Sequence, residues 1–211
     1  MSDSLGSINP GYPLRWWARH HLSDECRQYT DYEAEADRIT VYQPLVVPGL
    51  LQTPAYAAAA SRVILTGYSE ADIEARVQAR IRRQQVIEQR IAAGAAPELV
   101  VILDEIVLRR AIGDAAIIRD QLEHLVAQAQ RPHVTLTVLP TALGGHPGLG
   151  GVFELLEFHD DRDPALAFIE SASGDRLTRD TLYYRQTADA LTSAGTTGDE
   201  AVALVRRVLD E

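Results

Sequence analysis

Five consecutive apolar residues, Leu99–Leu103, constrain the fold of this chain more than any other segment. A short uninterrupted apolar run is typical of a strand that is buried on both faces. A second strand is predicted at Val134–Leu139, where apolar residues alternate with threonines. The intervening segment, Asp114–Gln130, carries its apolar residues at helical spacing. Strand, helix and strand make one β-α-β unit, so the two strands are expected to be parallel.

Helical patterns precede this unit, and short strands and closing helices follow it. We expect the earlier helices at 13–22, 53–65 and 69–91, with 29–38 as helix or loop. The later strands are expected near 151–158, 165–171 and 175–179, and the closing helices at 181–192 and 199–209. The segment Ile39–Tyr42 fits either a short strand or the end of a helix. This order predicts an α+β fold, with N-terminal helices on a mixed sheet of about four or five strands and with C-terminal helices. Residues 1–12 are expected to form a tail, and residues 13–211 a single domain.

Three polar residues are expected to meet at one edge of this sheet. Glu105 follows the first strand of the β-α-β unit, His146 lies in the Gly-rich loop after its second strand, and Glu170 ends a later strand. Because the chain reverses twice before that later strand ends, all three are predicted at the carboxyl edge, where ligands tend to bind in open α/β sheets. Arg109, one helical turn after Glu105, can face the same side.

The charge balance argues against nucleic-acid binding. The formal net charge is −10, and all 20 basic residues are arginines. The best basic patch, formed by five arginines between 76 and 90, is interleaved with Asp72, Glu74 and Glu88, which is typical of a solvated helix face. A chain this acidic repels a phosphate backbone, so we expect no direct binding of nucleic acid.

The same composition predicts a cytoplasmic protein. No apolar run approaches the ~20 residues that a membrane-spanning helix needs, and the N-terminus lacks the features of a signal peptide. Cys26 is the single cysteine, which excludes an internal disulfide and fits a reducing compartment.

No metal or cofactor is expected. His20 with Asp24, and His21 with Glu25, lie four apart and can pair on a helix, but the sequence has no Cys-x-x-Cys or His-Glu-x-x-His motif. It also has no Gly-x-Gly-x-x-Gly, no P-loop and no Gly-x-Ser-x-Gly, so nucleotide-binding and serine-hydrolase functions have no support.

The stretch 42–53 reads YQPLVVPGLLQT. It is similar to the motif Y-E-P-x-x-V-P-G-L-L-Q-T in the domain of unknown function that follows an XRE-type helix-turn-helix in actinobacterial, antitoxin-like regulators. Further matches occur in the same order along the chain: Arg83-Gln84, Leu103-Asp104-Glu105, Leu108-Arg109-Arg110, Gln121-Leu122, His124-Leu125, Val138-Leu139-Pro140, Gly145-His146, Gly151-Val152-Phe153 and Ile169-Glu170. From Trp16 onward, the chain therefore resembles that effector domain.

This resemblance implies a role in sensing a signal or binding a partner. The helix-turn-helix of the family has no counterpart in the 15 residues before Trp16, so the family's DNA-binding activity is not expected here. Two positions depart from the family pattern, since Gln43 replaces a glutamate and Phe168 a tyrosine.

Five residues are candidates for ligand binding: Arg109, Gln52, Tyr42, Trp17 and Phe168. Each has a structural alternative. Residues 47–52 contain no titratable group, and a tight turn with two leucines plugging the core is favoured over a pocket. Trp16 and Trp17 point about 100° apart on a helix, so one can line a cleft while the other is buried.

His146, Glu105 and Glu170 are candidates for acid–base catalysis. An imidazole can transfer protons near neutral pH, and the glycines around His146 let the backbone approach a ligand closely. The alternatives are a solvated loop histidine, and carboxylates that pair with Arg109 or Arg110.

Two functions follow from these patterns. The first is an effector module that binds a small molecule or a small protein partner, with dimer formation as a further possibility. The second is a cofactor-independent enzyme of secondary metabolism, a cyclase, isomerase or hydrolase, that uses the same pocket.

Overall fold

The computed structural model describes residues 24–159, 164–171 and 174–211. The predicted tail 1–12 and the predicted helix 13–22, with Trp16, Trp17, His20 and His21, lie outside the described residues.

A seven-stranded sheet runs through the described part of the chain in the order β6-β5-β4-β1-β2-β3-β7. The strands are β1 Arg38–Gln43, β2 Glu98–Asp104, β3 Val134–Leu139, β4 Phe153–Glu157, β5 Leu166–Ile169, β6 Arg176–Thr178 and β7 Thr196–Thr197. Strands β1, β2 and β3 are parallel, whereas β4 to β7 pair antiparallel with their neighbours. The α+β class and the parallel pair of the β-α-β unit are confirmed.

The prediction of four or five strands was too low for the described ranges. Strand β1 is buried along almost its whole length, so it lacks the polar–apolar alternation that would have separated it from a helix end. It pairs parallel with β2, which adds a second crossover to the one predicted. Strand β7 has two residues and is too short to leave a pattern.

The helices of the described residues are α1 Asp24–Glu35, α2 Pro54–Ile64, α3 Glu70–Ala92, α4 Glu105–Arg109, α5 Ala115–Ala129, α6 Leu182–Ala194 and α7 Gly198–Leu209, with the short 3-10 turns η2 Gly49–Leu51, η3 Thr141–Leu143 and η4 Pro147–Gly150. Helices α2, α3, α5, α6 and α7 lie close to their predicted positions, whereas α1 begins five residues before the predicted segment 29–38 and the short α4 was not predicted. The Thr53 hydroxyl caps α2, and Ser69 with Asp72 forms the predicted capping box of α3. Within the described residues, no helix is both long and apolar enough to cross a membrane.

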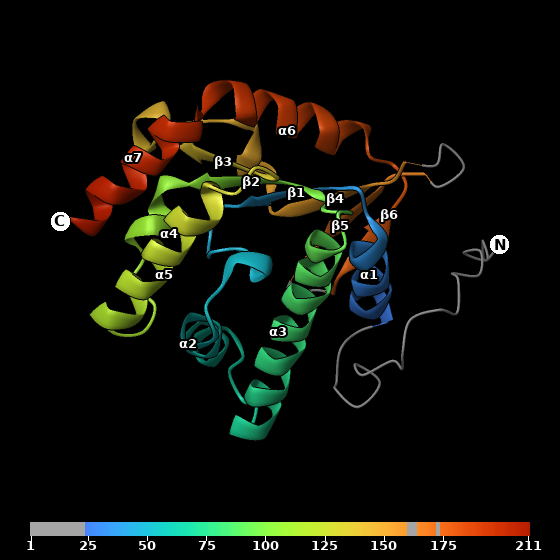
Figure 1. Ribbon diagram of the computed structural model, residues 1–211, viewed down its shortest axis with the longest axis horizontal. Helices are drawn as coiled ribbons and strands as arrows, with labels where there is room; N and C mark the ends of the chain where they lie inside the picture. The colour runs from blue at the N-terminus through green and yellow to red at the C-terminus, as the bar shows by residue number, and fades with distance from the viewer. Residues whose placement is uncertain (1–23, 160–163, 172–173) are drawn as a thin grey trace.

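Helices cover both faces of the sheet. Helix α6 lies on one face, and α1, α3 and α5 lie on the other (Figure 1). Consecutive residues of β1 point to opposite faces and enter different cores. Val41 joins the larger core beneath α1, α3, α5 and α7, whereas Tyr42 joins the smaller core beneath α6. The two faces therefore offer separate places for a functional site.

Candidate functional site

The predicted carboxyl edge exists, but its residues divide between the two faces of the sheet. Strand β5 is antiparallel to β4, which is antiparallel to β1, so β5 ends at the same edge as β1 to β3. Ile169 packs in the core beneath α6, and Phe168 packs in the core on the other face. By alternation, Glu170 lies on the Phe168 face. The ring of His146 packs edge-to-face on Tyr42, which belongs to the α6 face. Glu170 and His146 are therefore not brought together.

His146 has a carboxylate neighbour that differs from the predicted ones. Its Nε2 lies 3.5 Å from Oδ2 of Asp104, and its side chain is only 5% exposed. The Nδ1 atom of His146 and the hydroxyl of Tyr42 are buried, and neither has a hydrogen-bond partner among the described residues. This arrangement has the parts of an acid–base pair, but both rings are covered by protein.

The glycines around His146 serve the protein's own packing. A Cβ atom on Gly148 would lie 2.5 Å from Cζ of Tyr42, so the loop backbone approaches this ring more closely than any other residue would allow. The sequence predicted that the backbone of this loop can approach a ligand. In the structure the backbone approaches the Tyr42 ring.

Glu105 and Arg109 are fully engaged with each other and with nearby groups. Glu105 accepts hydrogen bonds from the Thr141 backbone N–H at 2.9 Å and from Arg109 Nε at 3.0 Å, and Arg109 also pairs with Glu211. The bond from Thr141, together with the Arg109 guanidinium, holds the pKa of Glu105 below its ordinary value. The structural alternative, a carboxylate paired with Arg109, describes this residue.

The other predicted ligand-binding residues are buried in packing roles. Phe168 stacks on Tyr29 with ring centroids 4.3 Å apart, and Tyr42 has no exposed surface. Gln52 donates from Nε2 to the Val47 carbonyl at 2.6 Å, while its Oε1 is buried without a partner in the part of the chain described. Trp17 lies outside the described residues.

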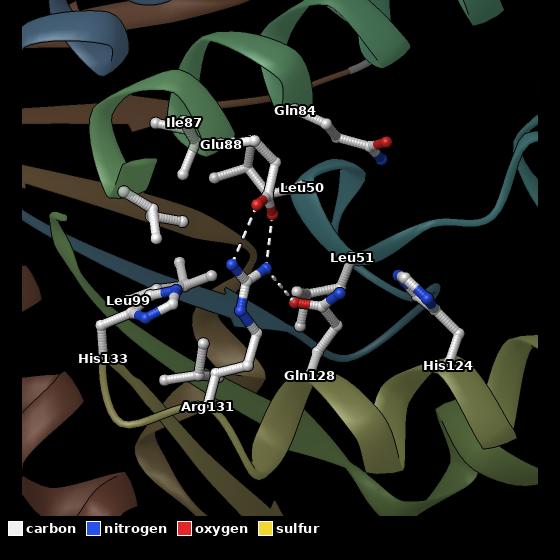
Figure 2. A pocket seen from close by; sticks show the side chains of 12 residues that line it. Leu50, Leu51, Gln84, Ile87, Glu88, Leu99, His124, Gln128, Arg131 and His133 are labelled. Carbon is white, nitrogen blue, oxygen red and sulfur yellow. Dashed lines mark hydrogen bonds and ion pairs between the residues drawn. The ribbon is translucent and has the colours of Figure 1, made fainter. Parts of the chain in front are cut away.

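A cavity of about 110 Å³ lies on the opposite edge of the sheet from the one predicted. Its lining comes from η2, α3, α5 and the first residues of β2 and β3: Leu50, Leu51, Gln84, Ile87, Glu88, Ile91, Leu99, His124, Gln128, Arg131, His133 and Val134. Figure 2 shows apolar side chains from the turn, the helix α3 and the strands around a polar wall from α5 and the turn after it. We call it the α3–α5 cavity.

Two glutamines hold the turn that forms one wall of the α3–α5 cavity. Gln84 on α3 donates to the carbonyls of Gly49 and Gln52, both at 2.8 Å. Gln121 on α5 donates to the Leu51 carbonyl at 2.8 Å and accepts from the Thr53 backbone N–H at 2.8 Å. The turn is thus clamped from two helices, which keeps Leu50 and Leu51 at the cavity and prevents α3 and α5 from closing on each other.

The polar wall of the cavity carries no net charge near neutral pH. Arg131 donates to both carboxylate oxygens of Glu88 and also to Gln128 Oε1 at 3.0 Å (Figure 2). Burial, with the Arg131 charge in second place, lowers the pKa of His124 and of His133 below the ordinary value. Both imidazoles are therefore neutral and can donate and accept hydrogen bonds.

Sequence reasoning assigned Leu50 and Leu51 to packing and did not predict this cavity. A signal was present in the segment that follows: His124, Gln128 and Arg131 recur at helical spacing on one side of α5 and its end. Polar residues on one side of a helix are also typical of a solvated face, so the pattern alone cannot separate a cavity wall from a surface.

A second polar region, the Arg83 network, lies on the same face of the sheet as the cavity. Arg83 pairs with Glu33 through two hydrogen bonds of 2.7 and 2.6 Å. The Tyr29 hydroxyl lies at hydrogen-bond distance from both Glu33, at 2.6 Å, and Glu154, and its single proton can be donated to one of them at a time. Burial, reinforced by Glu33 and Glu170 and opposed by Arg83, raises the pKa of Glu154 to about 7. Every hydrogen-bonding group in this network meets a partner, which is the usual condition for buried charge.

Within the described ranges, no three His, Cys, Asp or Glu side chains gather in a way that could hold a metal ion. The model of one protein family, described as Domain of unknown function (DUF5753), matches residues 26–207. No curated protein and no solved structure matches the chain at a significant level.

Proposed function

The chain belongs to the DUF5753 family, and we propose that it is an effector module, related to those of XRE-type regulators, that binds a small molecule in the α3–α5 cavity. The observation that carries the proposal is the cavity itself, an apolar recess of about 110 Å³ that the clamped turn keeps open. Ligand sites are typically concave and mostly apolar, with a few polar groups at the wall, as this recess is.

The size and lining of the cavity suggest a class of ligand. An apolar cavity of roughly 150 Å³ in another protein binds benzene, so about 110 Å³ suits a small ring or a branched aliphatic group. The floor, which includes Leu50, Leu51 and Ile87, removes such a group from water. His124 and His133 are neutral, and Glu88 already neutralises Arg131. We infer a neutral ligand with a compact apolar group and one hydrogen-bonding group.

The position of the cavity suits a sensor. A ligand there contacts α3 and α5 together with the turn between α2 and β1, so it links elements from distant parts of the sequence. It also lies beside the Glu88–Arg131 pair, which ties α3 to the turn after α5. Binding can shift a conformational equilibrium only if the ligand contacts two states differently, and a pair at the cavity wall offers such a contact. The sequence resemblance to regulator effector domains supports the same role, in the cytoplasm and with no direct contact to nucleic acid.

Calorimetry with small probes tests the proposal. Benzene and phenol should bind, and benzoate should bind more weakly because its charge must enter an apolar recess. Leu50→Trp, which places a large ring in the cavity, should abolish binding of both neutral probes. Ile106→Trp, at an exposed position of α4, is the matched control and should bind as the unchanged chain does. Binding that persists in Leu50→Trp, or no binding of either neutral probe, would remove the cavity as the site.

A second candidate function, a cofactor-independent enzyme of secondary metabolism, is supported by His146. Its Nε2 lies 3.5 Å from Oδ2 of Asp104, and its buried Nδ1 has no hydrogen-bond partner in the part of the chain described, so the imidazole and the carboxylate have the arrangement of an acid–base pair. In this hypothesis the carboxylate that acts with His146 is Asp104, and no longer Glu105 or Glu170. A metabolite extract incubated with the wild-type chain and with His146→Ala tests it. Product masses that appear only with the wild-type chain would support an enzyme, and identical products would end that hypothesis.

A further inference from the structure

The Glu88–Arg131 ion pair forms part of the polar wall of the α3–α5 cavity. Figure 2 shows the Arg131 side chain rising from the turn after α5, between His133 and Gln128, toward Glu88 on α3. Arg131 donates from Nη1 and Nη2 to the two carboxylate oxygens of Glu88, and the bond from Nη2 measures 2.9 Å. The Arg131 side chain is 26% exposed, so its guanidinium lies mostly within the protein, beside the recess that the proposed ligand occupies.

Gln128 also holds the Arg131 guanidinium. Its Oε1 accepts a hydrogen bond from Nη1 of Arg131 at 3.0 Å. An amide oxygen carries no ionic charge, so this bond helps to fix the position of the guanidinium without neutralising it. The position and the neutralisation of Arg131 therefore depend on different residues, since Gln128 contributes to the position and Glu88 supplies the counter-charge.

Glu88 sets the net charge of the polar wall. The hydrogen bond from Arg131 lowers the pKa of Glu88 below its ordinary value, so this carboxylate is ionised near neutral pH. His124 and His133, the other titratable residues of the lining, are neutral, as described above. The wall therefore holds one cation and one anion, and removal of the charge of Glu88 leaves a net positive wall.

We propose that Glu88 is the specificity-determining residue that restricts the α3–α5 cavity to neutral ligands. A guanidinium presents a planar pair of donors that suits a carboxylate, and Glu88 occupies these donors in Arg131. An anionic ligand must displace Glu88 or lie against its negative charge. With a neutral amide at position 88, the guanidinium can pair with the carboxylate of a ligand instead. This inference rests on the proposed function, because it assigns the charge specificity of the same cavity.

Calorimetry on the full chain with phenol and benzoate tests the inference, because the two probes share a ring and differ in charge. Glu88→Gln keeps the length of the side chain and one acceptor oxygen for Arg131, but it removes the negative charge. This variant should bind benzoate about 10-fold more tightly than the wild-type chain does, since a hydrogen bond to a charged group is gained. Its affinity for phenol should stay the same.

Two further variants and the salt concentration separate charge from packing. Glu74→Gln makes the same substitution on the same helix, at an exposed residue outside the lining, and should leave both affinities unchanged. The double variant Glu88→Gln, Arg131→Gln removes the cation as well and should lose the gain for benzoate. High salt should reduce the gain for benzoate in Glu88→Gln and leave phenol binding unaffected, because salt screens charges but not apolar contacts.

Phenol binding distinguishes failure of this inference from failure of the proposed function. If the wild-type chain binds phenol but Glu88→Gln binds benzoate no more tightly than the wild-type chain does, the role of Glu88 is overturned and the cavity remains a site. If none of these proteins binds either probe, the proposed function and the inference fail together. A gain for benzoate that the double variant keeps, or that phenol shows equally, also overturns the role of Glu88. The Glu88 side chain is 55% exposed, so loss of this pair should cost little stability.

Discussion

Two fully buried tyrosines on opposite faces of the sheet meet different surroundings. On the face covered by α1 and α3, the hydroxyl of Tyr29 lies at hydrogen-bond distance from the carboxyl groups of Glu33 and Glu154. On the face covered by α6, the hydroxyl of Tyr42 has no partner in the part of the chain described, and neither have His146 Nδ1 and Thr137 Oγ1. The first face pairs Arg83 with Glu33 in a network of charged groups, although Gln52 Oε1 and two Arg80 donors on that face have no partner among the described residues. The unpaired atoms of the second face all belong to neutral groups or to His146.

The two faces of the sheet therefore differ in how they accommodate buried polar groups. A buried charge without a partner costs far more than a buried neutral hydroxyl, so the pairing of Arg83 with Glu33 is expected to contribute strongly to stability. The α6 face accepts a few unpaired neutral atoms at a smaller cost. The α3–α5 cavity lies on the charged face, which is therefore the face that we associate with function.

The largest test of this comparison removes the cation at the centre of the network. Arg83→Met leaves Glu33, which is 2% exposed, without its counter-charge. We expect the free energy of unfolding to fall by about 3–5 kcal/mol, measured by urea denaturation. Arg62→Met breaks an exposed pair with Glu70 and serves as the control, for which we expect no measurable change. Equal effects of the two variants would show that the network does not stabilise the fold.

The two tyrosines can be compared directly by removing each hydroxyl. Tyr29→Phe removes a hydroxyl that lies at hydrogen-bond distance from two carboxyl groups, so it should cost about 1.5–3 kcal/mol of unfolding free energy. Tyr42→Phe removes a hydroxyl without a partner among the described residues, so stability should stay the same or rise slightly. Urea denaturation of both variants measures the difference, and a large loss in Tyr42→Phe would reveal a partner for that hydroxyl.

A glycine pair tests the packing on the α6 face. Gly148→Ala forces a methyl group into Tyr42, so we expect a loss of about 1–3 kcal/mol in thermal or urea unfolding. Gly145→Ala lies in the same loop, and a Cβ atom there meets nothing within 4 Å, so it should leave stability unchanged. If both variants behave alike, the loop does not close over Tyr42.

The pH dependence of stability tests the charged face with the smallest expected effect. The pKa of Glu154 is raised to about 7 in the folded chain, so the folded state holds a proton that the unfolded state releases near the ordinary value. This stabilisation is complete below the unfolded pKa and is lost as the pH rises through about 7. The fall in the free energy of unfolding over this pH range should appear in the wild-type chain and be absent in Glu154→Gln. Parallel pH profiles of the two proteins would contradict the role given to Glu154.

Much of the fold could be predicted because its signals are local. The apolar run of β2 and the capping residues Thr53 and Ser69 act on their own neighbours, and the structure confirms them. The edge at which β5 ends also followed from counting reversals. The face on which Glu170 lies did not, because a shift of one residue in a strand moves a side chain to the other face, and the sequence does not specify the register after a turn.

The candidate site was harder to predict for a different reason. A cavity forms where segments that are distant in sequence leave space unfilled between them, so the pattern of one segment cannot predict it. From the sequence, the turn that carries Leu50 and Leu51 is predicted to pack in the core. It forms a cavity wall because Gln84 and Gln121 hold its backbone through hydrogen bonds. Those contacts join residues more than 30 positions apart.

A methyl-resolved NMR titration with phenol tests the central claim, that function belongs to the charged face, because it reads both faces in one experiment. The account predicts shifts in the methyl groups of Leu50, Leu51, Ile87, Leu99 and Val134, which line the cavity, and none in Val100, Ile102 or Leu191 beneath α6. Shifts confined to the second group, or equal shifts on both faces, would contradict it.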